Sequence, residues 1–211
     1  MIRLALTLSL ISSISFGQST LDYSLYSKAI DSLIDVLDSN RDSISRVIVI
    51  KKYKPYENKI EGFGSLISEG SDQVIGITIG YDTSLIRLVK RDDIKTAILK
   101  LEKGFNNTPE LHESKFKLKT PVTTISDKTF KQFFDTKSKD KITIGWKNFY
   151  IKNPDVFGVY ELSTVIYSGD YACFYLAHHA KGFYGSGNLI IMQKMGDGEW
   201  QLVAKIRLWV A

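Results

Sequence analysis

The sequence predicts an α+β protein with an N-terminal helix, further strands, and a C-terminal antiparallel meander sheet against which helices pack. Two observations carry this prediction. Apolar residues recur at helical spacing over residues 20–38, as in a helix with one buried face. The C-terminal third contains four runs rich in β-branched and aromatic residues, and short turn sequences separate the first pair and the last pair.

The first half also contains strand and helix patterns. Residues 44–51 are rich in Val and Ile, which indicates a strand, and residues 74–81 and 85–89 suggest two more. Residues 92–103 place apolar side chains on one helical face, with aspartates at the start and Gly104 as the stop.

A polar connection over residues 105–119 is a possible seam between two halves of the chain. Beyond it we expect a short strand at 122–125 and a short helix capped by Asp127. A second helix carries Trp146 and ends before Pro154, because the residue before a proline disfavours the helical conformation.

The C-terminal third is the clearest part of the pattern. Chain order and short turns predict that its strands form an antiparallel meander with one face covered by helices. The expected strands are residues 158–167, 171–177, 188–194 and 200–210, with turns at 168–170 and 196–198.

Strict alternation along residues 200–210 would divide this strand into two faces. Trp200 would be buried on the apolar face, whose other members are Leu202, Ala204, Ile206 and Leu208. Trp209 would lie with Arg207 and Lys205 on the more polar face. An aromatic ring flanked by cations can bind a ligand or a partner, so Trp209, Arg207 and Lys205 are the candidate ligand-binding residues. The alternative is that Trp209 packs under a helix or under the N-terminal half.

Residues 1–17 have the pattern of a secretory signal peptide, which leaves 18–211 as a single α+β domain. A short basic start precedes an apolar run with interspersed serines, and Ser15-Phe16-Gly17 suits signal peptidase cleavage. A buried N-terminal strand or helix is the alternative interpretation. Because the last expected strand runs almost to Ala211, with no room for a sorting domain, we expect a periplasmic rather than a surface location.

The composition narrows the classes of protein to which this chain can belong. The chain is 44% hydrophobic with a net charge of +5, and acidic residues lie among its lysine clusters, so solvated lysine faces are favoured over a nucleic-acid surface. After residue 17 no apolar run is long enough to span a membrane. Cys173 is the only cysteine, so no intrachain disulfide forms, and it is expected to be a buried apolar residue rather than a reactive thiol.

No catalytic, cofactor or metal site stands out. Residues 182–187 are rich in glycine, but a strand pattern follows them, whereas a phosphate loop would need a helix, so a hairpin connection is favoured. His178 and His179 are neighbours on an expected strand and would point to opposite faces, which disfavours a shared metal ion. Cys173 is not expected to form a dyad with either histidine. His178 faces the other side of the extended strand, and His179 shares the face of Cys173 but lies roughly 20 Å away at about 3.3 Å per residue.

The residues from Trp146 onward resemble an uncharacterised family of secreted bacterial proteins. The pattern consists of turn glycines and strand aromatics, and it covers residues 146–211. Its members are Trp146, Phe149, Tyr150, Pro154, Gly158, Glu161-Leu162-Ser163, Gly169-Asp170-Tyr171-Ala172, Gly185-Ser186-Gly187, Lys194, Gly198-Glu199-Trp200 and Leu208-Trp209-Val210. The resemblance implies no activity and no catalytic residues. In shape, the meander is similar to cystatin-like and NTF2-like domains, which host many functions.

These observations favour a secreted, non-catalytic protein that binds a small ligand or an envelope protein. The alternative is an envelope hydrolase or another enzyme whose active site is assembled from dispersed residues.

Overall fold

The computed structural model describes residues 19–38, 45–52, 87–105, 108, 110–182 and 184–211. The helices of this part are α1 (Thr20–Asp38), α4 (Asp92–Gly104), the 3-10 helix η2 (Glu113–Lys115), α5 (Asp127–Gln132) and α6 (Lys141–Lys152). The strands are β1 (Arg46–Ile50), β2 (Val122–Ile125), β3 (Val156–Leu162), β4 (Ile166–Ser168), β5 (Tyr171–His179), β6 (Gly185–Lys194) and β7 (Trp200–Val210).

The strands form one seven-stranded mixed sheet in the order β2-β1-β3-β5-β6-β7, with β4 paired to β5. The strand β1 is parallel to both of its neighbours, β2 and β3. All the other pairings are antiparallel, and β5, β6 and β7 form consecutive hairpins. The fold is therefore α+β, with an antiparallel C-terminal sheet as the sequence predicts.

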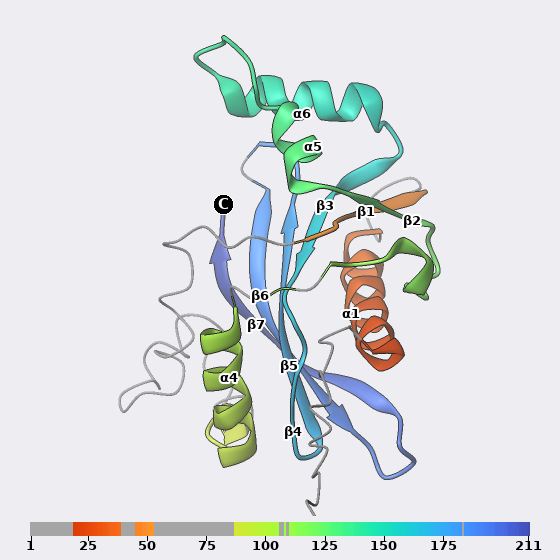
Figure 1. Ribbon diagram of the computed structural model, residues 1–211, viewed down its shortest axis with the longest axis vertical. Helices are drawn as coiled ribbons and strands as arrows, with labels where there is room; N and C mark the ends of the chain where they lie inside the picture. Colours follow the sequence, from red (N-terminus) through yellow and green to blue (C-terminus); the bar gives the residue numbers. More distant parts are fainter. Residues whose placement is uncertain (1–18, 39–44, 53–86, 106–107, 109, 183) are drawn as a thin grey trace, which may run out of the picture.

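Helices cover both faces of this sheet (Figure 1). The apolar stripe of α1 packs on one face, where Tyr26 and Phe174 meet edge to face with 5.2 Å between ring centroids. On the opposite face, α4 covers β5, β6 and β7, and the aromatic side chains of α5 and α6 cover β1 and β3. We call these the α1 face and the α4 face.

The structure refines several predicted elements. The expected strand 158–167 is two strands, because Ser163 turns inward and its hydroxyl accepts a hydrogen bond from Tyr175 N at 2.8 Å. Residues 87–89 are helical instead of extended, and the strand expected at 74–81 lies outside the described residues. The cap of α5 is Ser126 rather than Asp127, since the Ser126 hydroxyl accepts from Thr129 N.

Part of the connection 105–119 is anchored to the first half of the chain. Leu111 N donates to Lys51 O at 2.6 Å, and His112 N donates to the Tyr23 hydroxyl at 2.8 Å. Because β1 lies between β2 and β3, segments before and after this connection form one sheet.

A β-bulge near the start of β7 changes which side chains share a face. Leu202 and Ala204 pair with consecutive residues of β6, so Val203 is an extra residue. Trp200 and Leu202 therefore lie on the α1 face, whereas Ala204 and Ile206 lie on the α4 face. The expectation that Trp200 shares its face with Ala204, Ile206 and Leu208 is wrong for this reason. Trp200 is buried, as expected, at 9% exposure.

Candidate functional site

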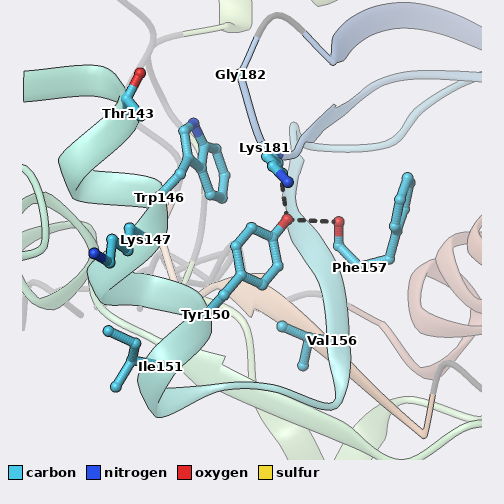
Figure 2. Close-up of a pocket in the computed structure, with 9 residues that line it drawn as sticks. All are labelled: Thr143, Trp146, Lys147, Tyr150, Ile151, Val156, Phe157, Lys181 and Gly182. Atoms are coloured by element: carbon cyan, nitrogen blue, oxygen red, sulfur yellow. Dashed lines mark hydrogen bonds between the residues drawn. The ribbon is translucent and has the colours of Figure 1, made fainter. Parts of the chain in front are cut away.

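A hollow of about 740 Å³ lies between α6, the start of β3 and the loop that joins β5 to β6 (Figure 2). We call it the α6 hollow. Its lining residues are Thr143, Trp146, Lys147, Tyr150, Ile151, Val156, Phe157, Lys181 and Gly182.

The position of α6 explains which residues reach the hollow. The helix begins after Asp140, whose carboxylate accepts from Thr143 N at 3.1 Å, and it ends at the residue before Asn153. Thr143, Lys147 and Tyr150 are three or four positions apart, so they lie along one side of the helix and line the hollow.

Tyr150 joins the three walls of the hollow. Its hydroxyl donates to Phe157 O at 3.1 Å in β3 and accepts from Lys181 N at 3.2 Å in the β5–β6 loop (Figure 2). The Trp146 ring stacks on the Tyr150 ring, with 5.7 Å between centroids and 27° between planes. These contacts hold two aromatic side chains of the lining in fixed positions, which favours a largely preformed site.

The lining is apolar with positive charge. Ile151 is 69% exposed although its side chain is aliphatic, and Val156 and Phe157 add further apolar surface. Lys147 and Lys181 supply two cations, and no Asp or Glu is among the lining residues. Neither lysine forms an ion pair within the described residues. The arrangement suits an apolar molecule that carries an anionic group.

A second hollow, of about 450 Å³, includes Trp146, Phe130, Glu161 and His179 in its lining. Here Glu161 Oε2 and His179 Nε2 are 3.0 Å apart, and the His179 ring lies against Trp209 with 5.4 Å between centroids. A search of the described residues finds no group of three or more His, Cys, Asp or Glu side chains that could hold a metal ion. The pair alone therefore supplies too few ligands for a typical protein metal site.

The structure separates the three candidate residues at the end of β7. Arg207 and Trp209 pair with consecutive residues of β6, so Leu208 is the extra residue of a second bulge. Arg207 and Lys205 lie on the α1 face, whereas Trp209 lies on the α4 face. The bulge shifts the alternation by one residue, and the expectation that Trp209 shares a face with these cations is wrong.

Trp209 instead packs against its own face of the sheet. Its indole N–H donates to the Tyr175 hydroxyl at 2.9 Å, and its ring is partly buried beside His179. Burial, with Arg207 nearby as a weaker cause, lowers the pKa of Lys205. The hydrogen bond and the ring contact of Trp209 are therefore both with β5 of the same sheet.

The two neighbouring histidines point to opposite faces, as expected for a strand. His178 lies on the α1 face between Phe157, at 5.0 Å between ring centroids, and Tyr160, at 4.7 Å. Burial, with His179 nearby as a weaker cause, lowers the pKa of His178 to about 4, so the imidazole is neutral at pH 7. His179 pairs with Glu161 on the α4 face.

Sequence reasoning missed the residues of the α6 hollow. The spacing of Lys147, Tyr150 and Ile151 along one helix was available as a signal, but it equally describes a helix packed on a core. Lys181 lies in a turn far along the chain, and no periodicity connects it with α6. Only the pairing of β5 with β3 places this lysine near the helix.

Comparisons with known proteins place the chain in no established group: no family model, no curated protein and no solved structure matches it. The fold and the hollow define its class only broadly, as an α+β protein with a mixed sheet and an aromatic-lined, positively charged hollow at one end. Among the helices of the described part, none is long and apolar enough to cross a membrane.

Proposed function

We propose that this protein is a secreted, non-catalytic binding protein whose α6 hollow takes an apolar small molecule with a carboxylate or a similar anionic group. Secretion, with a periplasmic location, is supported by the basic start, apolar run and small residues of residues 1–17. Binding is supported by the size and the lining of the α6 hollow.

The observation that carries the proposal is the combination of an apolar lining with two cations that form no ion pair in the described part of the chain. Aromatic and aliphatic side chains remove an apolar ligand from water, which is the main favourable contribution to binding. Lys147 and Lys181 would then attract an anionic group at the rim, while the lining residues include no carboxylate to repel it. A cationic ligand of the same shape would be disfavoured.

The experiment compares two probes of equal chain length and opposite charge. Decanoate and decyltrimethylammonium, each below its micelle concentration, are titrated into the purified protein by calorimetry. We expect saturable binding of decanoate and much weaker binding of the ammonium compound. Replacing both lysines, as Lys147→Gln with Lys181→Gln, should weaken decanoate binding several-fold, as is typical of exposed charge pairs.

Lys100→Gln is the matched control, because Lys100 is exposed on α4 and does not line the hollow. This variant should bind decanoate as the unchanged protein does. Equal decanoate affinities for the double lysine variant and the control, or equal affinities for the two probes, would contradict the proposal.

Secretion has a separate test. Expressed with its own N-terminus in a Gram-negative host, the protein should appear in the periplasmic fraction, and its N-terminal sequence should begin at Gln18. Recovery from the cytoplasm with an intact N-terminus would refute export without affecting the binding proposal.

A further inference from the structure

A third hollow, of about 350 Å³, lies where the β5–β6 hairpin meets the end of β7. We call it the Arg207 hollow. Its lining residues are Phe157, His178, Tyr184, Gly185, Ser186, Arg207, Val210 and Ala211. Phe157 also lines the α6 hollow, so the two hollows are neighbours.

The positive charge of Arg207 has no partner within the described part of the chain. Six other lysines and arginines there form ion pairs, whereas Arg207, like Lys147 and Lys181, forms none. The pairs are Lys28–Glu199, Arg46–Asp155, Lys51–Glu110, Arg91–Asp93, Lys119–Asp35 and Lys131–Asp127. Lys205 lies on the same face of β7, and, after burial, the charge of Arg207 contributes to lowering its pKa, so the two cations make the local potential positive.

Hydroxyl groups add donors to this hollow. Ser186 Oγ accepts a hydrogen bond from Asn188 Nδ2 at 3.3 Å, which leaves the hydroxyl proton of Ser186 for another acceptor. Tyr184 is 70% exposed and brings a second hydroxyl to the rim. The guanidinium of Arg207 presents several N–H donors in a planar fork.

The floor of the hollow is uncharged. His178 stacks on Phe157 with 17° between the ring planes, and burial keeps the imidazole neutral by lowering its pKa to about 4. Among the lining side chains, Arg207 is thus the one full charge near pH 7, and neither Asp nor Glu is present. An anion entering the hollow would meet the donor groups of Arg207, Ser186 and Tyr184.

We propose that the Arg207 hollow binds a phosphate group. Three donor-bearing side chains, Arg207, Ser186 and Tyr184, suit a tetrahedral oxyanion with three or four acceptor oxygens better than a carboxylate with two. The group belongs to free phosphate or to the head of a phosphate ester, which present the same oxygens. This inference does not depend on the ligand proposed for the α6 hollow.

The test is calorimetric titration of the purified protein with inorganic phosphate at low ionic strength. We expect one saturable site, and Arg207→Gln should weaken binding roughly ten-fold to a hundred-fold, as expected for a lost charge-assisted hydrogen bond. Ser186→Ala should weaken it several-fold. Lys147→Gln removes a cation of the α6 hollow and should leave phosphate affinity within about two-fold.

A short-chain phosphatidate below its micelle concentration distinguishes the two sources of the phosphate. Tighter binding than inorganic phosphate, lost in Arg207→Gln, would identify a lipid head group, whereas equal affinities would identify the free ion; both results support the site. Absence of saturable phosphate binding would overturn the proposal. So would equal weakening by Arg207→Gln and Lys147→Gln, or no effect of Arg207→Gln in a protein with an unchanged melting temperature. Decanoate binding can persist in each of these cases, so the two proposals fail separately.

Discussion

At the scale of single residues, Gly158 determines how closely β3 approaches β5. Its φ of +153° lies where side chains are strongly disfavoured. A Cβ at this position would overlap the carbonyl oxygen of His179 and come within 2.8 Å of His178 Nε2. The missing side chain is therefore what lets the His178 imidazole pack between Phe157 and Tyr160.

We expect Gly158→Ala to lower the free energy of unfolding by roughly 2–5 kcal/mol, since backbone strain and overpacking act together. Gly104→Ala is the control, because nothing lies within 4 Å of a Cβ there and the residue ends α4. That substitution should be neutral or stabilising by up to about 1 kcal/mol. Urea denaturation measures both, and equal effects would contradict the close approach at Gly158.

His178 provides a pH-dependent prediction at the same scale. Its pKa is about 4 in the folded protein and near the ordinary histidine value of 6.5 when unfolded. Between these values the unfolded chain binds the proton more readily, so stability is present above pH 6.5 and is lost as the pH falls towards 4. Each pKa unit corresponds to about 1.4 kcal/mol, so the total loss is on the order of 3 kcal/mol.

The measurement is the free energy of unfolding from pH 7 to pH 4, compared with that of His178→Leu. The variant should lose much less stability over this interval, because it has no buried imidazole at this position to protonate. Asp155 does not complicate the comparison: its hydrogen bonds to Arg46 lower its pKa to about 2, and its effect appears below about pH 4. Parallel curves for the two proteins would show that His178 is not the titrating group.

At the scale of elements, β7 is shaped by its two bulges. Val203 and Leu208 are the extra residues, and each one shifts the alternation of side chains between the α1 face and the α4 face. As a result, Ile206 packs in the cluster beneath α4, while Arg207 reaches the hollow beside His178. The two shifts together leave Trp200 and Trp209 on opposite faces.

Deletions test this description of β7. Deleting Val203 joins Leu202 directly to Ala204, whose partners in β6 are already consecutive, so every side chain keeps its face. We expect a folded protein, destabilised by roughly 1–2 kcal/mol as for many single changes. Deleting Lys205 instead exchanges the faces of Ile206 and Arg207, and it should prevent folding because a charge would replace a core residue. Circular dichroism and thermal unfolding distinguish the two, and the reverse order of stability would refute the assigned register.

At the scale of the whole molecule, one sheet supports three apolar clusters. They lie beneath α1, beneath α4 and beneath the α5–α6 pair. No disulfide within the chain contributes, because Cys173 is the only cysteine, and it is completely buried. The stability of the fold therefore rests on packing and hydrogen bonds.

Thiol chemistry checks this conclusion. Burial, with Asp93 as a weaker cause, raises the pKa of Cys173 to about 12, so the thiol is protonated as well as inaccessible. We expect Ellman's reagent to label the thiol only after denaturation, and a thiol reductant to leave the melting temperature unchanged. Rapid labelling of the folded protein would mean that the sheet opens near Cys173. A lower melting temperature in reductant would indicate a disulfide between chains.

The sequence by itself determined the elements whose signals are local. The helix at 20–38 has the predicted bounds and the last strand spans 200–210 as predicted, because an apolar stripe and β-branched alternation depend on near neighbours. The tertiary structure decided which side chains share a face of the sheet and which distant segments are neighbours. A bulge is one extra residue without a composition signal, so strict alternation put Trp209 with Arg207 and Lys205, and the pairing with β6 separates them. In the same way, only the pairing of distant strands brings Lys181 to α6 and Arg207 to His178, since spatial neighbours far apart in the chain leave no periodic trace.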